Sequence, residues 1–130
     1  MLPDSLSDDE YPSLRRYMIR FSKEAKLNAV EQAHGLFLFT GEEKDGLALH
    51  DDFYAHAATL ATLPDRHVIR RAESKLLGLE LRRLVVRSQF HLFYRIEDGD
   101  DGPMVVVVYI RSGYQKPLSK DEARRILENQ

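Results

Sequence analysis

Apolar and polar residues recur with helical spacing in the first half of the chain and with strand-like spacing in the second. After a short β-prone run at 17–21, Ser22 occupies the position of a helix N-cap, where its hydroxyl can accept from an unpaired amide. The spacing predicts a helix from there to about Phe39, ended by the glycines and charges of 41–46. Four apolar side chains are expected near one face of it: Ala25, Val30, Ala33 and Phe37.

A second helix is predicted from about Leu47 to Leu63, where Pro64 stops it. Its apolar stripe repeats at steps of three and four: Leu49, Phe53, His56, Leu60 and Leu63. Because only a short loop separates this helix from the first, the two are expected to form a helical hairpin.

The second half contains runs typical of strands. Residues 81–87 and 90–96 are β-prone and are separated by a turn at 88–89, and the acidic stretch 97–102 with Pro103 predicts another turn. Residues 104–110 (MVVVVYI) are the most β-branched run, which predicts a central strand buried on both faces.

The C-terminus carries a helix signal of its own. Ser119 and Glu122 have the spacing of a capping box before a helix from Lys120 to about Glu128. The whole order predicts an α+β fold: N-terminal strand, α-helical hairpin, three-stranded antiparallel meander and C-terminal helix, with the hairpin covering one face of an antiparallel sheet. We divide the chain into a flexible acidic tail (1–14), one domain (15–118) and the terminal helix (119–130).

Composition narrows the protein class. The chain has 130 residues, of which 43% are hydrophobic, which suits one compact domain. It has no cysteine, which excludes disulfides, thiolate zinc sites and a cysteine nucleophile. It shows no secretory signal and no apolar run long enough to span a membrane. We therefore expect a soluble cytoplasmic protein without membrane contact.

The formal net charge of −2 hides an uneven distribution. Residues 1–10 hold four acids and no base, whereas 66–95 hold eight bases against two acids, a balance of +6. Arginine dominates the basic segment, and its planar guanidinium suits phosphate or carboxylate partners. The alternative is a solvated sheet face balanced by acidic loops.

Familiar catalytic signatures are absent. The five histidines show no zinc-type spacing, and there is neither a glycine-rich phosphate loop nor a nucleophile elbow. We therefore predict no metal and no small-molecule cofactor.

Alternation along the strands gathers polar side chains on one face of the sheet. Arg83, Val85 and Arg87 should share a face, as should His91, Phe93 and Arg95 on the next strand. Such a face could bind nucleic acid through phosphate pairing and stacking. It could equally be a set of charges protecting a solvated sheet.

Four segments carry a resemblance to a known family. YMIRFSKEA (17–25), ATLATLPDR (58–66), GLELRRLVVRSQFHLFYRIED (78–98) and VVVVYIRSG (105–113) follow one another as in toxins of the RelE/ParE superfamily of type II toxin–antitoxin systems. The resemblance extends from Tyr17 to Pro117. It implies the same fold that the pattern predicts.

The resemblance implies two modes of action. RelE-like toxins are endoribonucleases that cleave messenger RNA on the ribosome without a metal, by attack of the 2′-hydroxyl on the neighbouring phosphate. In that case Arg83 and Arg111 would stabilise the phosphate, and Lys116 would be the acid. The candidate bases would be Tyr114 and His91.

ParE-like toxins instead inhibit DNA gyrase, with no known catalytic site of their own. The segment IRSGYQKPLS stands where the plasmid-stabilisation subgroup often has R-H-G-x-R-x-P, although Ser112 replaces the histidine and Gln115 the second arginine. These features favour the ParE branch. A third possibility is an inactive relative that only binds a partner.

Either active branch implies a cognate antitoxin that holds the toxin inactive. Such partners wrap the helical hairpin and the sheet edge, often with acidic residues against a basic face. The resemblance assigns the partner contacts to four arginines: Arg82, Arg83, Arg87 and Arg95.

Overall fold

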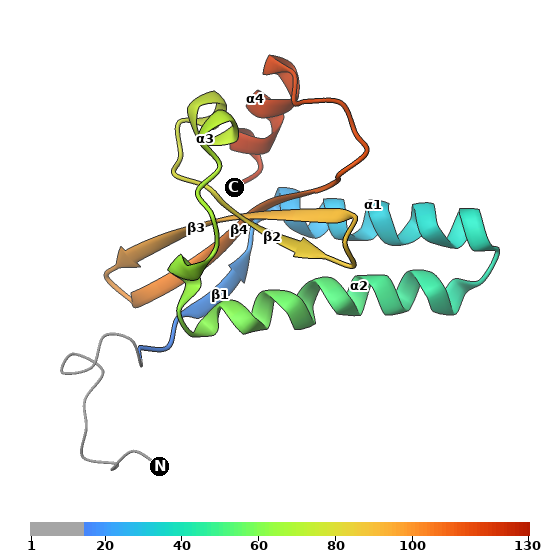
Figure 1. Ribbon diagram of the computed structural model, residues 1–130, viewed down its shortest axis with the longest axis horizontal. Helices are drawn as coiled ribbons and strands as arrows, with labels where there is room; N and C mark the ends of the chain where they lie inside the picture. Colours follow the sequence, from blue (N-terminus) through green and yellow to red (C-terminus); the bar gives the residue numbers. More distant parts are fainter. Residues whose placement is uncertain (1–14) are drawn as a thin grey trace, which may run out of the picture.

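The computed structural model describes residues 15–130, so the predicted tail at 1–14 lies outside the described residues. The chain folds as α+β, with two helices after the first strand, three further strands and a C-terminal helix (Figure 1). The strands are β1 (Met18–Phe21), β2 (Arg82–Val86), β3 (Phe90–Gly99) and β4 (Gly102–Ser112). The α-helices are α1 (Lys23–Thr40), α2 (Glu43–Ala58), α3 (Arg71–Leu77) and α4 (Lys120–Glu128).

The four strands form one sheet in the order β1-β4-β3-β2. β4 is central, as predicted, and every residue from Val105 to Ile110 is buried. The expectation of a purely antiparallel sheet was wrong, because β1 pairs with β4 in parallel while β2, β3 and β4 form the antiparallel meander. The intervening α1–α2 hairpin gives the chain the length that a parallel crossover needs.

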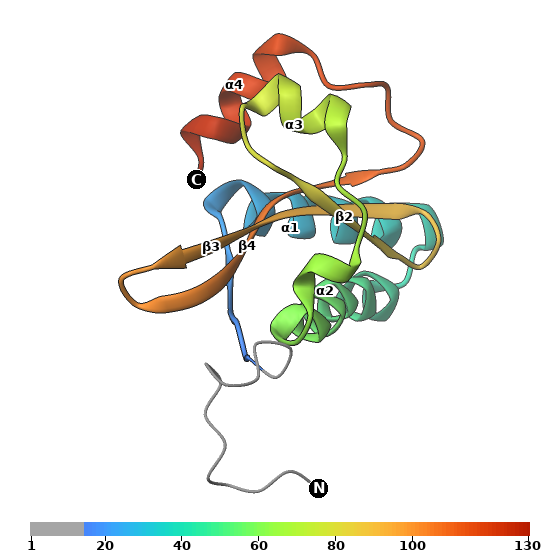
Figure 2. The same ribbon diagram turned by 60° about the vertical axis from the view of Figure 1, so that its left-hand side comes forward.

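The α1–α2 hairpin covers one face of the sheet (Figure 2). Ser22 caps α1 as predicted, its Oγ accepting from the amide of Ala25 at 3.0 Å. Asn28 then accepts the Ile110 amide at 2.9 Å and so fixes α1 against β4. The predicted stripe was partly wrong: Ala29 lies in the core, whereas Val30 is 56% exposed. The reason is that the turns of α1 nearest β4 are buried, and Val30 points away from the sheet.

The bounds of α2 differ from the prediction of 47–63. The helix begins at Glu43, within the expected loop, and ends at Ala58, after which short 3-10 turns carry the chain to Arg66. Leu49, Phe53 and Leu60 are buried as the stripe predicted. Leu63 is 45% exposed, because it has left the helix and adopts a φ of 49° before Pro64.

Helices α3 and α4 lie over the opposite face of the sheet (Figure 2), called here the α3/α4 face. They cover a second core, whose buried members are Leu77, Leu81, Phe93, Val108, Tyr109, Ala123 and Ile126. The sequence did not predict α3. Its seven residues are too few for a helical stripe, and no side chain caps its N-terminus.

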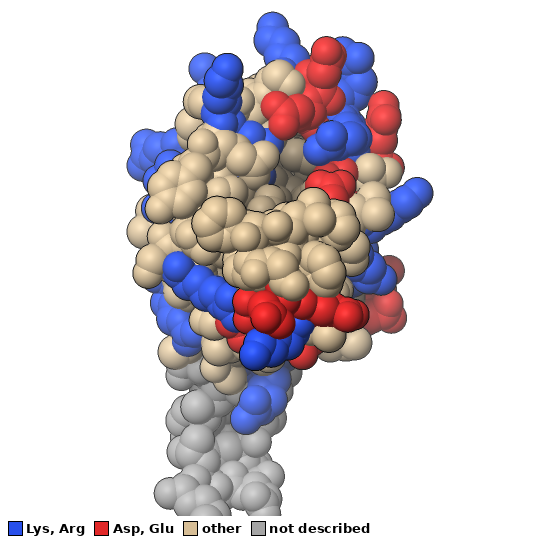
Figure 3. All heavy atoms as spheres, turned by 90° about the vertical axis from the view of Figure 1, so that its right-hand side faces the viewer, with Lys and Arg blue, Asp and Glu red and all other residues tan. Residues whose placement is uncertain are grey.

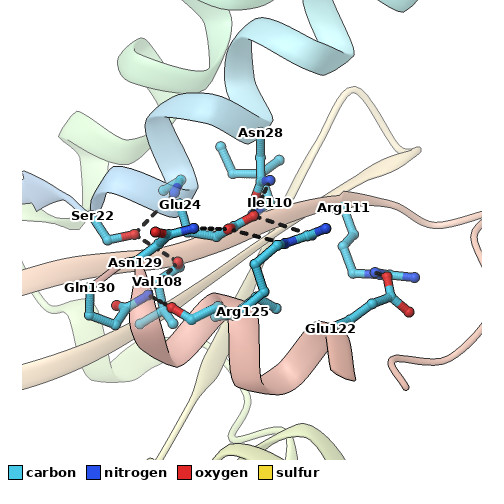
Figure 4. A network of polar contacts seen from close by, with 12 residues as sticks. Ser22, Glu24, Asn28, Val108, Ile110, Arg111, Glu122, Arg125, Asn129 and Gln130 are labelled. Carbon is cyan, nitrogen blue, oxygen red and sulfur yellow. Dashed lines mark hydrogen bonds and ion pairs between the residues drawn. The ribbon is translucent and has the colours of Figure 1, made fainter. Parts of the chain in front are cut away.

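A buried polar network holds α4 on the domain (Figure 4). The carboxylate of Glu24, only 3% exposed, accepts from Asn28 at 2.6 Å and from Asn129 at 3.0 Å, and lies 3.4 Å from Nε of Arg125. At the start of α4, Ser119 and Glu122 form the predicted capping box. The network therefore joins the first helix of the chain to the last.

Two turns also differ in detail. β3 and β4 extend to Gly99 and Gly102, so the predicted turn at 97–102 shrinks to its central residues. The β2–β3 turn includes Arg87, whose φ is 53°. Arg87 thereby leaves the strand and does not share the face of Arg83 as predicted; its side chain reaches Asp52 on α2 instead.

Candidate functional site

Three of the predicted site residues meet on the α3/α4 face. β3 places His91 opposite Arg111 of β4 and opposite Val85 of β2. Arg83, two residues before Val85, lies on the same face of β2, opposite Phe93. The strand register thus brings one imidazole and two guanidinium groups to one side of the sheet.

A cavity of about 170 Å³, the polar cavity, opens beside these residues between the sheet, α3 and the loop at 113–118. Of the predicted residues, His91, Arg111 and Lys116 line it, together with Glu73, Phe93 and Tyr109. Tyr114 is not part of the lining, and its side chain is 86% exposed. The structure therefore assembles His91, Arg111 and Lys116 but leaves Tyr114 outside.

The surroundings of His91 favour its neutral form. Burial is the largest cause of a lowered pKa for His91, and the positive charges of Arg83 and Arg70 lower that pKa further. Glu73 opposes the shift but does not cancel it. A neutral imidazole can accept a proton, which is what a general base at this position would have to do.

Arg111 is engaged by groups of its own chain. Its Nη1 donates to Glu122 at 2.8 Å, and its Nη2 donates to the carbonyl of Lys116 at 2.5 Å. The hydrogen bond from Arg111 is the main reason that the pKa of Glu122 falls from 4.5 to about 2. The charge of Arg111 is thus balanced by a carboxylate throughout the neutral range.

Arg83 differs from Arg111 in this respect. Its guanidinium makes no hydrogen bond or ion pair with any residue between 15 and 130, although it is only partly exposed. Its positive charge acts on His91. Arg83 is therefore one cation of this face that remains open to an anionic partner.

The other three arginines predicted as partner contacts are engaged within the chain. Arg82 donates to the carbonyls of Asp65 and His67 at 2.8 and 2.7 Å. Arg87 pairs with Asp52 at 2.6 Å, and Arg95 pairs with Glu97 on its own strand. The bonds of Arg82 hold the 65–67 loop against β2, the pair of Arg87 holds the β2–β3 turn against α2, and the pair of Arg95 lies within β3.

Sequence reasoning missed three members of the α3/α4 face. Arg70 and Glu73 come from α3 and its N-cap, and Tyr109 comes from the apolar run of β4. The hydroxyl of Tyr109 is buried and unpartnered, and burial raises its pKa well above the usual range. The sequence did contain one indication of this site: a tyrosine, whose hydroxyl needs a hydrogen-bond partner, lies within a strand that was expected to be buried on both faces.

A second feature lies on the hairpin. A groove of about 440 Å³, the outer groove, runs between α1 and α2 and is lined chiefly by Val30, Ala33, His34, Phe37, Leu47 and His50. Two of its lining side chains, Val30 and Leu47, are exposed, and so are Leu38 at 66% and Phe39 at 88% in the last turns of α1. Figure 3 views the end of the molecule where α1 turns into α2 and shows a broad area without charged side chains.

Other classes of site are not represented in residues 15–130. No three histidine, aspartate or glutamate side chains in that range are grouped closely enough to hold a metal ion. None of the helices there has the length and apolar character needed to cross a membrane.

Comparison with known proteins adds no assignment. No protein-family model matches the sequence, and no curated protein matches it.

Proposed function

We propose that this chain is a growth-inhibiting toxin of the RelE/ParE type, neutralised by a cognate antitoxin protein. The observation that carries the proposal is the outer groove, whose apolar and partly exposed lining lies on a two-helix hairpin packed on the sheet of an α+β fold. Exposed apolar surface of this kind is typical of protein interaction sites. The order of elements and the motifs from Tyr17 to Pro117 support the RelE/ParE part of the proposal.

The groove suits one apolar face of a partner helix. Helix-in-groove recognition uses apolar anchors at helical spacing against a hydrophobic channel. Val30 and Leu47, 56% and 59% exposed, are the side chains that such a partner would bury most. We assign the antitoxin to this groove, with Arg83 as a further contact for an acidic residue.

For the target, we propose DNA gyrase, reached by binding rather than by catalysis. Cleavage of RNA would require free cations beside the base. Arg111 is balanced by Glu122, and Tyr114 lies outside the polar cavity. Two of the five residues assigned to catalysis are thus not arranged for it, which supports action through a binding surface.

Ribosome-dependent cleavage of messenger RNA is the second candidate, and one observation favours it. Arg83 is an unpaired cation next to His91, whose pKa is lowered, so the neutral imidazole could accept the 2′-hydroxyl proton. Arg83 would then stabilise the charge that develops on the phosphate.

Inducible expression in a bacterial host distinguishes the candidates. Growth, plasmid supercoiling and message integrity are followed in one culture. Growth arrest with lost supercoiling and intact messages is the expected result. The alternative result is growth arrest with messages cut at ribosome-bound codons, which Arg83→Ala abolishes and Arg71→Ala does not. That result would make messenger RNA, and not gyrase, the target. Normal growth with both assays unchanged would contradict an active toxin.

The antitoxin assignment has a separate test. The protein encoded next to this chain is co-expressed with it, and recovery of the complex is measured. Leu47→Glu places a charge in the outer groove and should abolish the complex, whereas Val68→Glu, at a site 70% exposed and outside the groove, should not. Equal recovery of the two variants would remove the groove from the interface.

A further inference from the structure

The outer groove continues beyond its apolar part towards β1. Val30 lines both the groove and a second cavity of about 480 Å³, whose other lining residues lie on β1 and in the first turns of α1. On the α2 side, Tyr54 lies one helical turn after His50, with 5.1 Å between the ring centroids, and lines a third cavity of about 390 Å³. The second and third cavities share three residues: Arg20, Phe21 and Lys26. One channel between the two helices, the α1/α2 channel, therefore extends from β1 to the hairpin tip, where α1 turns into α2.

The end of the α1/α2 channel beside β1, called here the basic end, is formed by Arg20, Lys23 and Lys26. All three side chains are exposed. No Asp or Glu side chain in residues 15–130 forms an ion pair with any of them, and the Arg20 guanidinium donates only to the main-chain oxygen of Gln130, at 3.4 Å. The neighbouring carboxylate of Glu24 is buried and engaged in the network of Figure 4. The three positive charges are therefore accessible to a partner.

The opposite end of the channel, at the hairpin tip, carries the reverse charge. Glu43 lines the groove there, and residues 42–45 hold three acids and one lysine. Between the two ends the lining is largely apolar, and Val30 and Leu47 are exposed by 56% and 59%. A nucleic acid, with a phosphate at every nucleotide, would meet cations only at the basic end and would be repelled at the tip. The charge pattern favours instead a protein segment that is apolar over most of its length and acidic at one end.

The length of the channel defines the length of that segment. The turns of α1 from Lys23 to Phe37 advance roughly 21 Å at 1.5 Å per residue. A partner helix of about four turns covers the same distance. Such a helix buries one apolar stripe in the groove, as helix-in-groove partners do.

We propose that the outer groove binds a partner helix with an acidic cluster at one end, and that this cluster binds the basic end. The apolar stripe of the partner helix lies between Val30 and Leu47, and its carboxylates pair with Arg20, Lys23 and Lys26. Because the hairpin tip is acidic, the same helix placed in the reverse direction would bring like charges together. The charges thus set the direction in which the partner lies. This contact rests on the proposed antitoxin site, and it differs from the four arginine contacts that the family resemblance implies.

The test is the rate at which the full-length chain associates with the protein encoded next to it. The double variant Lys23→Glu with Lys26→Glu should associate about ten-fold more slowly than the parent in about 50 mM salt, because charges at the rim of an interface chiefly change the association rate. The difference should largely disappear in about 1 M salt, where the Debye length is about 3 Å. Leu47→Ala, in the apolar part, should instead speed dissociation and leave association almost unchanged.

The matched control is the double variant Arg71→Glu with Lys75→Glu. Both side chains are exposed on α3, on the other face of the sheet, so the net charge changes equally while the channel is untouched. This variant should associate nearly as fast as the parent. Glutamates at 23 and 26 lie in the first turn of α1, where negative charge suits the helix dipole, so the test variant should fold, and its circular dichroism spectrum reports this directly.

Other outcomes separate the acidic contact from the antitoxin site. A complex that Leu47→Glu abolishes but that Lys23→Glu with Lys26→Glu leaves unchanged would keep the groove and overturn the acidic contact alone. Equal slowing by both double variants would mean that only net charge matters, which also overturns the contact. If the parent formed no complex, the proposed antitoxin site and this contact would fail together.

Two other occupants of the channel would contradict the proposal and are detected in the same series. If the isolated chain formed a dimer that Leu47→Glu abolishes, the groove would belong to a second copy. If changing the acids of residues 1–10 to amides made association faster, the chain's own carboxylates would occupy the basic end.

Discussion

Arg111, at the C-terminal end of the central strand β4, pairs with Glu122 in the first turn of α4, with 2.8 Å between Arg111 Nη1 and Glu122 Oε2 (Figure 4). The same Glu122 side chain accepts the Ser119 amide at 3.1 Å in the capping box. One carboxylate therefore stabilises the start of α4 and at the same time balances the cation at the edge of the polar cavity. This shared role makes the α4 attachment sensitive to pH.

The first prediction concerns acid stability. The folded-state pKa of Glu122, about 2, lies below its ordinary value of 4.5, so its contribution is complete above pH 4.5 and is lost as the pH falls towards 2. Glu122→Gln can keep the capping box but loses the ion pair. We expect the variant to lose about 1 kcal/mol of unfolding free energy at pH 7, since the carboxylate is one-third exposed, and to converge on the parent near pH 2.

Urea unfolding between pH 2 and pH 7 measures this difference. The control is Asp121→Asn, one residue earlier on α4, whose carboxylate is 90% exposed and lies 3.7 Å from Arg124. Its unfolding curves should follow those of the parent at every pH. A constant offset for Glu122→Gln across the whole range would show that the ion pair does not cause the effect.

Local signals in the sequence predicted much of the fold. The N-cap at Ser22 and the capping box of Ser119 and Glu122 act within one helical turn, so they can be recognised without the tertiary structure. The β-branched run of 104–110 identified the central strand for the same reason. The parallel partner of that strand was not predictable, because β1 meets β4 across more than eighty residues.

The candidate site was predicted only in part. Strand alternation correctly grouped Arg83 with Val85, and His91 with Phe93, within their own strands. That the two groups share a face follows from the register of β2 and β3, which alternation alone does not give. Arg87 was misplaced because a turn conformation, invisible to alternation, rotates it towards α2. Glu73 and Tyr109 were missed because α3 is short and the tyrosine lies within an apolar run. These errors occur where tertiary packing overrides a local pattern.

A second prediction tests the electrostatics of the α3/α4 face. Arg83→Gln removes a positive charge that lowers the pKa of His91, so that pKa should rise but remain below 6.5, because burial is the larger cause. The pKa of His67 serves as the control, since burial, Arg66 and Arg82 lower it, and it should not move. NMR titration of the imidazole signals measures both. If the pKa of His91 did not change, the charge of Arg83 would not be one of the causes that lower it.

The lowered pKa of His91 also sets a direction for stability. Since the imidazole binds a proton less readily in the folded chain than in the unfolded one, protonation favours the unfolded state below pH 6.5. As the pH falls below 6.5, the free energy of unfolding of Arg83→Gln should therefore decrease less than that of the parent. The urea series of the parent and this variant provides the comparison.

The third prediction concerns the packing of the helical hairpin. A Cβ added at Gly46 would lie 2.6 Å from the Ala33 carbonyl oxygen and 3.3 Å from Cβ of Phe37, so α1 and α2 would have to separate. Gly46→Ala should cost roughly 1–3 kcal/mol, the usual range for overpacking. Gly35→Ala makes the same substitution within α1 with nothing within 4 Å, and should gain about 1 kcal/mol from helix propensity.

Urea unfolding of the two alanine variants at pH 7 measures the contrast. Opposite signs are the expected outcome, because only Gly46 lies at the close approach of the helices. If Gly46→Ala were as stable as Gly35→Ala, the hairpin would be less tightly packed than the structure describes. The outer groove, which Gly46 also lines, would then need a different geometry.

The fourth prediction concerns the β2–β3 turn. Arg87 and Ser88 have φ angles of 53° and 63°, and the Gln89 amide donates to the Val86 carbonyl at 3.3 Å. Positive φ at both central residues is the requirement of a type I′ hairpin turn, which favours glycine at the second position. A left-handed conformation costs a non-glycine residue roughly 1–2 kcal/mol, whereas glycine avoids this penalty. Ser88→Gly should therefore raise the free energy of unfolding by about 1 kcal/mol, after the greater chain entropy of glycine is subtracted.

Urea unfolding at pH 7 measures this gain, and Gln89→Gly is the matched control. Gln89 is the next residue and does not have a positive φ, so glycine there offers no relief and should lower stability by about 0.5–1 kcal/mol. The bond between Arg87 and Asp52 is untouched by either change, so the contact between the turn and α2 remains in both variants. A loss of stability in Ser88→Gly would mean that the turn does not hold Ser88 in the left-handed region, and the register that brings His91 opposite Val85 would then need another explanation.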